Sequence, residues 1–268
     1  RIISALFSIP AGILLVYSGG VPLLLSLMAV AVVAANELCT LALRKGCSPG
    51  RGISLASVIG LISLAYLGKV QWMAGLIGFT LLAALVYQLL WRRTGNALIN
   101  PALTIFIPVY VGWPMAALLL LRGPKWDVKG MGMVITILST VWATDIGAYF
   151  LGRSLGRRKL SPAVSPKKTL EGAVGGLLTG LLTGLGINWA ARLAGWWPSL
   201  DVGRALGLVF VSSISGQVGD LVESAFKRDA QVKDSGRFLP GHGGALDRFD
   251  SVFFALPVAY YYIRLLVP

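Results

Sequence analysis

Long apolar runs separated by short polar loops constrain this chain more than any other feature of its sequence. Most of these runs have about 17–25 residues, the length that an α-helix needs to cross the hydrocarbon core of a bilayer. Helices are the expected spanning form, because backbone polar groups inside lipid must be satisfied within their own segment. Only 13% of the residues are charged, against about a quarter in soluble domains. The sequence therefore predicts an all-α, polytopic integral membrane protein.

We expect about nine transmembrane helices. They are placed at residues 2–17, 21–43, 53–68, 71–91, 101–121, 131–151, 170–191, 204–225 and 249–267. In this plan, residues 1–100 form N-terminal transmembrane helices, and residues 101–268 form a catalytic transmembrane portion with cytoplasmic loops 152–169 and 226–248. We expect no cleavable signal peptide, since the first apolar run lacks a small-residue cleavage site.

The basic residues indicate an orientation rather than a nucleic-acid partner. The formal net charge is +13, but the cations lie between apolar spans and are not interleaved with aromatic residues on a polar surface. The loops richest in lysine and arginine are expected on the cytoplasmic side. The prediction is a multi-pass protein of the cell inner (cytoplasmic) membrane, whose active site faces the cytoplasm and which binds no nucleic acid.

The stretch from Ser224 to Asp250 is the most polar part of the chain. It reads S-A-F-K-R-D-A-Q-V-K-D-S-G-R-F-L-P-G-H-G-G-A-L-D-R-F-D and holds the only histidine, His242. A solvated loop near anionic head groups would explain its lysines and arginines, but not its four aspartates or its G-H-G-G turn. Carboxylates that hold a hard cation, basic side chains that neutralise phosphate and glycines that admit a ligand explain all of them. This pattern favours a polyphosphate and divalent-metal site.

The acidic residues of this region indicate where a metal would bind. Asp220, Glu223 and Ser224 share one face near the end of span 204–225, and Asp247 and Asp250 open the last span. A helix N-terminus alone would favour the last two aspartates, but it does not account for Asp220 in an apolar helix. We predict Asp220 and Asp247 as the leading metal ligands and Asp250 and Asp234 as further candidates.

The basic residues and the turn would bind phosphate oxygens. Lys227, Arg228, Lys233 and Arg248 are the expected clamps. His242 would form, with Gly243 and Gly244, a turn that approaches the phosphates. We expect His242 to donate a hydrogen bond to phosphate rather than to act as a general base.

A second polar block lies between residues 145 and 176. Asp145 lies within a predicted span, where a polar contact between packed helices would be enough to explain it. Thr169 or a neighbour is expected to cap span 170–191, with Glu171 in the first turn. Lys167 and Lys168 at the same helix end would attract polyphosphate, although a plain positively charged loop also explains them. The glycines that follow, from Gly172 to Gly184, predict close packing of this helix against a neighbour.

Glu37 is the one acidic residue within the N-terminal spans. An acid inside a span is costly and is usually functional or paired. Arg44 and Lys45 are near enough in the sequence to form an ion pair with it. The sequence supports a functional role for Glu37 and a simple ion pair equally.

The pattern S-x-x-K-R-x(4)-K-D-x(4)-L-P-G-H-G-G-x-x-D-R-x-D, from Ser224 to Asp250, resembles the signature of phosphatidate cytidylyltransferases, also called CDP-diglyceride synthases. The blocks D-x-G-A-Y-x-x-G-R-x-x-G from Asp145 and S-P-K-K-T-L-E-G-A-V-G-G from Ser165 are similar to the same family. The resemblance covers roughly the C-terminal half of the chain. Residues before about Asn100 match in hydrophobic character only.

The resemblance implies transfer of CMP from CTP to phosphatidic acid, which gives CDP-diacylglycerol and pyrophosphate. It implies Mg²⁺ as cofactor, and a second metal or a monovalent ion stays open, as does a homodimer. The implied catalytic residues are Asp220, Asp247, Lys227, Arg228, Lys233, Asp234, His242 and Arg248. The implied substrate-binding residues are Asp145, Ser165, Lys167, Lys168, Thr169, Glu171, Ser224, Gly243 and Gly244. The implied metal ligands are Asp220, Asp247 and Asp250. The alternatives are a polyprenol kinase, an ether-lipid cytidylyltransferase and, further away, a transporter.

Overall fold

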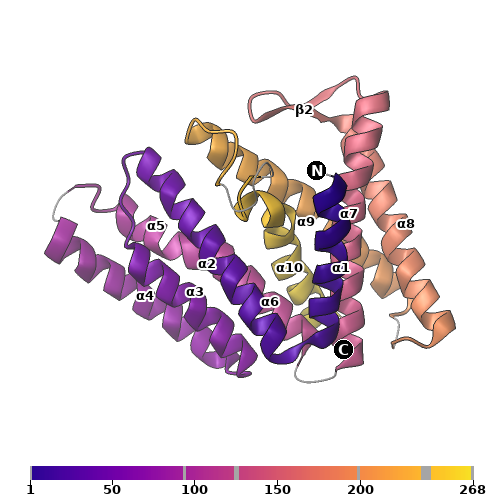
Figure 1. Cartoon of the computed structure of the whole chain (residues 1–268), viewed down its shortest axis with the longest axis horizontal. Coiled ribbons are helices and arrows are strands. Elements are labelled where there is room, and N and C mark those ends of the chain that lie inside the picture. The colour runs from indigo at the N-terminus through magenta and orange to yellow at the C-terminus, as the bar shows by residue number, and fades with distance from the viewer. Residues whose placement is uncertain (1, 93–94, 124–126, 198–199, 237–242, 267–268) are drawn as a thin grey trace. The chain divides into compact units, whose positions relative to one another are not determined.

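The computed structural model describes residues 2–92, 95–123, 127–197, 200–236 and 243–266, most of which are helical (Figure 1). The α-helices are α1 (Ile2–Ser18), α2 (Gly20–Arg44), α3 (Arg51–Tyr66), α4 (Met73–Tyr87), α5 (Ile99–Ile107), α6 (Trp113–Arg122), α7 (Val128–Leu155), α8 (Leu170–Ala194), α9 (Val202–Asp229) and α10 (Leu246–Leu266). Three short helical turns are η1 (Val70–Trp72), η2 (Gln88–Arg92) and η3 (Pro108–Gly112). The two strands are β1 (Lys159–Ser161) and β2 (Ser165–Thr169).

Within the described residues, 7 helical segments are long and apolar enough to cross a membrane. They are Gly20–Arg44, Val70–Trp91, Ile99–Arg122, Val128–Leu155, Leu170–Ala194, Val202–Asp229 and Leu246–Leu266. Helix α3 is also apolar but has 16 residues, which span about 24 Å against a hydrocarbon core of about 30 Å. The prediction of an all-α polytopic membrane protein is confirmed, whereas the count of nine spans is not confirmed.

The chain divides into two compact units. Unit 1 comprises residues 1–120 and 226–249, and unit 2 comprises residues 121–225 and 250–268. Helices α9 and α10 each contribute to both units, because the boundaries fall after residue 225 and after residue 249. The division of function at about residue 100 stays a prediction.

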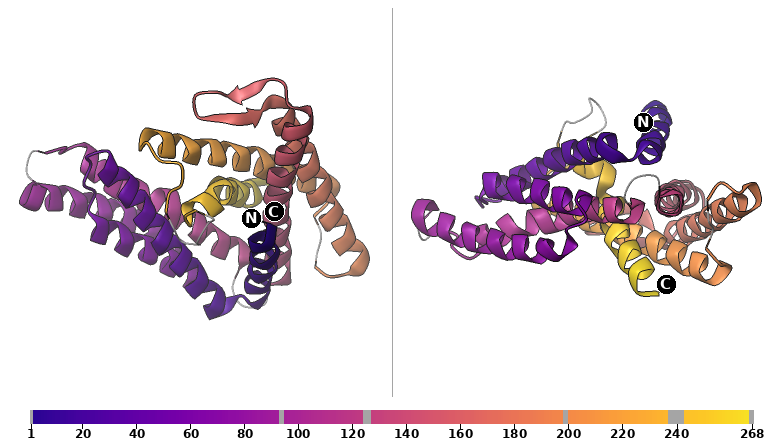
Figure 2. Two further views of the ribbon diagram at one scale, coloured as in Figure 1. Left: turned by 45° about the horizontal axis from the view of Figure 1, so that its top comes forward. Right: turned by 90° about the horizontal axis from the view of Figure 1, so that it is seen from below.

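Unit 1 is built around α2, α3 and α4, which lie side by side in sequence order (Figures 1 and 2). Buried polar groups in unit 1 form hydrogen bonds between helices: the hydroxyls of Ser57 and Thr80 lie 2.7 Å apart, and Ser54 Oγ donates to the Thr104 carbonyl at 2.9 Å. Such bonds join helices where lipid supplies no hydrophobic driving force. Between α5 and α6, Pro108 has no N–H to donate, and the helix continues there through the wide turn η3.

Unit 2 is organised by the packing of α7 against α8 (Figures 1 and 2). Gly172, Gly176, Gly180 and Gly184 recur every four residues along α8. A Cβ at Gly176 would overlap the Thr144 carbonyl and Ala148 of α7. The expectation that these glycines permit a close helix contact is therefore confirmed, and the neighbour is α7. A hydrogen bond of 2.8 Å between the hydroxyls of Thr144 and Ser213 joins α7 to α9.

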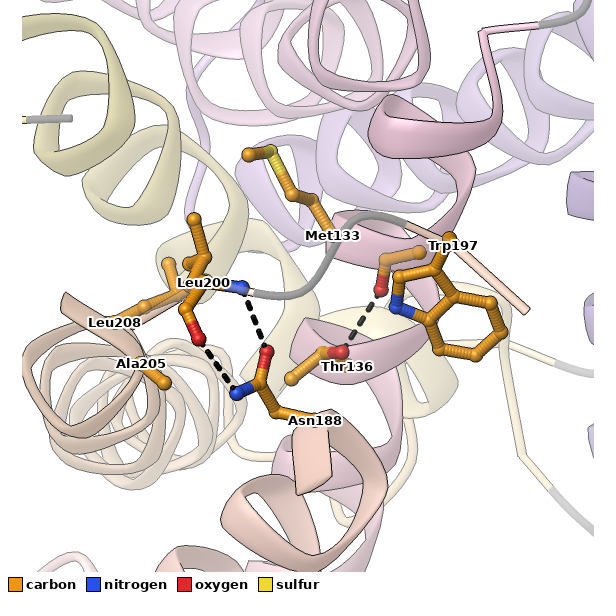
Figure 3. Close-up of a pocket in the computed structure, with 8 residues that line it drawn as sticks. Met133, Thr136, Asn188, Trp197, Leu200, Ala205 and Leu208 are labelled. Carbon is orange, nitrogen blue, oxygen red and sulfur yellow. Dashed lines mark hydrogen bonds between the residues drawn. The ribbon is translucent and has the colours of Figure 1, made fainter. Parts of the chain in front are cut away.

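The start of α7 borders a small cavity in unit 2, lined mostly by apolar side chains (Figure 3). Asn188 of α8 holds the chain that follows this helix: its side chain donates to the Leu200 carbonyl and accepts from the Leu200 N–H, both at 3.0 Å. The Trp197 ring lies against Gly132, where a Cβ would overlap it. The cavity has a volume of about 10 Å³, roughly the space of one water molecule. It is too small for a nucleotide or a lipid head group.

Candidate active site

The block from residue 156 to residue 172 folds as a hairpin that leads into α8 (Figure 1). Strands β1 and β2 pair antiparallel, with Lys159 opposite Thr169. Thr169 is the N-cap of α8, since its Oγ1 accepts from Gly172 N at 3.1 Å. Glu171 accepts from the N–H groups of Arg157 at 3.0 Å and Arg158 at 3.1 Å. The predicted cap at Thr169 is confirmed, and Glu171 holds the turn before β1.

Three predicted acidic residues come together in unit 2, each from a different helix. Asp145 of α7, Asp220 of α9 and Asp250 of α10 lie close enough for their charges to act on one another. Ser251 Oγ donates to Asp145 Oδ1 at 3.3 Å, which joins α10 to α7. Lys168 Nζ lies 2.7 Å from Asp220 Oδ2 and brings the hairpin to the same cluster. Residues from three helices and the hairpin thus share one charged site.

Glu223 adds a fourth acid to this part of unit 2. It lies one turn after Asp220 on α9, has no exposed surface, and its charge acts on Asp250. The carboxylates of Asp145, Asp220 and Glu223 all act on Asp250, and such crowding of acids favours a bound cation. The sequence pattern of Asp220, Glu223 and Ser224 on one helix face identified this region correctly as acidic.

A separate network surrounds Asp247 in unit 1. Lys227 Nζ of α9 lies 2.5 Å from Asp247 Oδ1, and both side chains are largely buried. The other carboxylate oxygen, Oδ2, accepts from Ser235 N and Gly244 N at 2.8 Å. Ser235 Oγ also lies 2.9 Å from this oxygen. Asp247 therefore holds Lys227 and the backbone on both sides of the segment 237–242.

Glu37 of α2 reaches the same network in unit 1. Its carboxylate accepts from Ala245 N at 3.0 Å and from Leu246 N and Ser235 Oγ, each at 2.9 Å. Lys45, one of its two expected partners in the sequence, forms an ion pair with Asp229 instead. Glu37 and Ser235 are absent from the residues that the sequence assigned to the site. The only signal in the sequence was the acid inside an apolar span.

The remaining predicted residues take different positions. Arg228 donates to the Val232 carbonyl at 3.3 Å, whereas Lys233, Asp234, Arg248 and Lys167 are exposed and Ser165 and Ser224 are half-buried. Gly243 has φ of 84°, a backbone conformation that favours glycine. His242, like Arg237, lies outside the described residues, and the prediction for it stays a prediction.

The donor chemistry of the acid cluster in unit 2 fits a magnesium ion. In the part of the chain that the structure describes, no three histidine, cysteine, aspartate or glutamate side chains form a ready-made metal cage. Magnesium does not need one, because proteins usually bind it through one or two carboxylates together with substrate phosphates and water. Asp220 and Asp250 supply such carboxylates, with Asp220 Oδ2 paired to Lys168 and Asp250 Oδ1 accepting from Ser251 N. Both oxygens of Asp247 are bonded, to Lys227, Ser235 and Gly244.

Comparison with known proteins gives a consistent family assignment. The sequence model of the Cytidylyltransferase family matches residues 1–266. A phosphatidate cytidylyltransferase of Synechocystis sp. is 39% identical over 177 residues, which are 66% of this chain and 56% of that protein. The chain thus spans little more than half the length of this relative.

Two further relatives match along almost their whole length. The phosphatidate cytidylyltransferase of Staphylococcus aureus (strain COL) is 34% identical over 96% of each chain. The phosphatidate cytidylyltransferase of Bacillus subtilis (strain 168) is 34% identical over 99% of this chain and 97% of its own. The chain belongs to the cytidylyltransferase family.

Proposed function

We propose that this protein transfers CMP from CTP to phosphatidic acid and releases pyrophosphate, which makes it a phosphatidate cytidylyltransferase. The observation that carries the proposal is the near full-length match to the S. aureus and B. subtilis proteins of that name. The site supports it, because acids, lysines and a glycine turn are the groups that handle a nucleoside triphosphate. The product, CDP-diacylglycerol, would serve phospholipid synthesis.

The reaction replaces one phosphoanhydride bond with another. A phosphate oxygen of phosphatidic acid attacks the α-phosphorus of CTP in line, and the bond from that phosphorus to the oxygen of the β-phosphate breaks. The electron pair leaves with pyrophosphate. The attacking phosphate is already ionised, so no side chain has to remove a proton. Catalysis then rests on holding the reacting groups together and neutralising their charge.

The basic residues are proposed to bind the phosphates. In unit 2, Lys167 and Lys168 lie on β2, directly before the start of α8, where the positive end of the helix dipole favours anions. In unit 1, Lys227 and Arg228 lie in the last turn of α9, Lys233 follows this helix, and Arg248 lies in the first turn of α10. Thr169 and Glu171 would act by shaping the hairpin, because both are bonded to its backbone.

Magnesium is proposed as the cofactor, held by Asp220 and Asp250 with Asp145 beside them. When bound, the ion would neutralise phosphate charge and orient the triphosphate. Asp247 was also predicted as a ligand, and we propose that it positions Lys227 and the turn at Gly244.

The location of the chemistry is likewise a proposal. The chain is a multi-pass membrane protein, and its bacterial relatives suggest the cytoplasmic membrane. The lysines and arginines of residues 152–169 and 226–248 favour a site on the cytoplasmic side, where CTP is available. Dimerisation along α8 stays a prediction.

Pyrophosphate release by the purified protein in detergent tests the proposal. We expect release that needs CTP, phosphatidic acid and Mg²⁺ together, and that falls at least a hundredfold in Asp220→Asn. Asp201→Asn is the matched control, because Asp201 is an exposed aspartate that pairs with Arg204. Release with an ether-linked acceptor alone would assign a different lipid. CDP formation with a polyprenol would indicate a kinase. The absence of both pyrophosphate release and CDP formation with every lipid tested would contradict an enzymatic role.

A further inference from the structure

Glu37 is a buried acid whose hydrogen bonds go to the polar segment that carries the signature motif. Only 8% of its surface is exposed. Its partners in unit 1 lie 198 to 209 residues away in the sequence. Hydrogen bonds to an ionised carboxylate are shorter and stronger than those between neutral groups. A carboxylate with three such donors is therefore a firm attachment between α2 and the start of α10.

The bonds satisfy backbone groups that a helix cannot satisfy by itself. The first N–H groups of a helix have no partner within it, and a carboxylate there also complements the helix dipole. At the start of α10, Gly244 N donates to Asp247 and the next two N–H groups, of Ala245 and Leu246, donate to Glu37. Two carboxylates thus hold three consecutive amides directly after the glycine turn.

Ser235 links the two carboxylates. Its hydroxyl lies 2.9 Å from Glu37 Oε2 and 2.9 Å from Asp247 Oδ2. A hydroxyl has one hydrogen, so it serves one of these oxygens at a time. Through Asp247 the link extends to Lys227, one of the proposed phosphate clamps. The position of Lys227 thus depends on a residue of α2 that is far away in the chain.

The glycines on both sides of the segment 237–242 make room for this carboxylate. A Cβ at Gly236 would overlap Glu37 Oε1, and a Cβ at Gly244 would overlap Glu37 Oε2 and Ser235 Oγ. Both overlaps involve groups fixed by several hydrogen bonds, which cannot turn away freely. The last glycine of the G-H-G-G turn is therefore required by Glu37.

We propose that Glu37 is a positioning residue for the nucleotidyl transfer: it holds the backbone of residues 244–246 and, through Ser235, the Asp247–Lys227 pair, without touching either substrate. This inference rests on the proposed function. It favours the functional interpretation of Glu37, because the hydrogen bonds of Glu37 go to Ser235, Ala245 and Leu246, whereas Lys45 pairs with Asp229. A residue needed for folding alone would lower the amount of folded protein but not the turnover of the folded fraction.

The test uses the full chain with the variants Glu37→Gln, Ser235→Ala and their combination. Glutamine keeps the shape of glutamate, but its NH₂ group must face at least one of the three donors. Asp229→Asn is the control, because Asp229 is an exposed acid of unit 1 that pairs with Lys45. Turnover and KM are measured for CTP and phosphatidic acid. Hydrogen exchange of the peptide 243–249 is followed by mass spectrometry, and gel filtration gives the folded fraction.

We expect Glu37→Gln to elute as the wild type, to lose roughly tenfold to a hundredfold in kcat, as small displacements near a reaction do, and to change either KM by about twofold at most. Its amides at 244–246 should exchange faster, those of Asp229→Asn should not, and the combined variant should lose little more than Glu37→Gln alone. An unchanged kcat, or a loss fully explained by less folded protein, would overturn the inference. If the wild type releases no pyrophosphate, the proposed function is refuted, and the positioning role of Glu37 with it. If the wild type is active but the amides of Glu37→Gln exchange at the wild-type rate, only the link through Glu37 is refuted.

Discussion

Lys168 of β2 and Asp220 of α9 form an ion pair within unit 2, with 2.7 Å between Nζ and Oδ2. The pair joins the S-P-K-K-T-L-E-G block to the acid cluster that we propose as the magnesium site. A lysine ammonium on a metal-binding carboxylate competes with the metal for that oxygen. Binding of magnesium would free Lys168 for the phosphates of the nucleotide.

The first prediction concerns this competition. Replacing Lys168 with methionine should strengthen magnesium binding in the absence of nucleotide by up to about fivefold, since partly exposed ion pairs contribute up to about 1 kcal/mol. The same variant should turn over more slowly, because a phosphate-binding charge is lost. Titration calorimetry with magnesium alone measures the affinity. Lys167→Met, one residue along β2 and exposed, is the control and should leave that affinity unchanged; weaker binding in Lys168→Met would contradict the competition.

The second prediction follows from the mutual repulsion of the acids in unit 2. Asp250→Asn should raise the thermal stability of the metal-free protein by about 1 kcal/mol, or about 2–4 °C, because a buried carboxyl group crowded by other acids is replaced by a neutral amide. The same change should weaken magnesium binding. Thermal unfolding in detergent with chelator and with added magnesium measures both effects. The bond that Asp250 Oδ1 accepts from Ser251 N can be kept by the asparagine oxygen, so a lower stability of Asp250→Asn without metal would contradict the destabilising effect of the buried, crowded carboxyl group.

The third prediction concerns the pair between Lys227 and Asp247. The exposed fractions of the two side chains are 13% and 10%, so removing one charge leaves the other largely buried without its oppositely charged partner. Lys227→Met should cost about 3 kcal/mol of unfolding free energy. The combination with Asp247→Asn should cost clearly less than the sum of the two single changes. Denaturant unfolding of the four proteins gives the coupling, and additive losses would show that the pair is not important for stability.

The fourth prediction compares two glycines of α8. Gly176→Ala should destabilise unit 2 by about 1–3 kcal/mol, because the new methyl group meets the α7 backbone and Ala148. Gly186→Ala should be neutral or stabilising by up to about 1 kcal/mol, because nothing lies within 4 Å of a Cβ there. Both are glycine-to-alanine changes in one helix, so they differ mainly in their surroundings. Equal melting temperatures for the two variants would contradict the close packing of α7 and α8.

The sequence predicted the features that depend on local pattern. The positions of the helices follow from the apolar runs, and the cap at Thr169 follows from the residue type at the start of α8. The role of the glycines in α8 could be predicted because small residues spaced one turn apart permit a close helix contact. The acidic face that includes Asp220 was visible from helical spacing alone.

The partners of the charged residues could not be predicted in this way. The expectation that Asp247 is a metal ligand stays a prediction, and the bonds of its oxygens to Lys227, Ser235 and Gly244 were not visible in the pattern. Ser235 occupies a position that the signature leaves variable, so nothing in the pattern distinguished it. Glu37 bonds to residues about 200 positions away, and helical periodicity contains no information on such contacts. The contribution of Asp145 to the acid cluster likewise depends on how α7 packs within unit 2.

The measurement that tests the central claim most directly follows the label of CTP into lipid. The purified protein is incubated with phosphatidic acid, Mg²⁺ and CTP that carries radioactive phosphorus at either the α or the γ position. A cytidylyltransferase transfers the α-phosphorus, so we predict label in the lipid from α-labelled CTP only, with the γ label recovered as pyrophosphate. Lipid labelled from γ-labelled CTP would show phosphoryl transfer instead and would contradict the account.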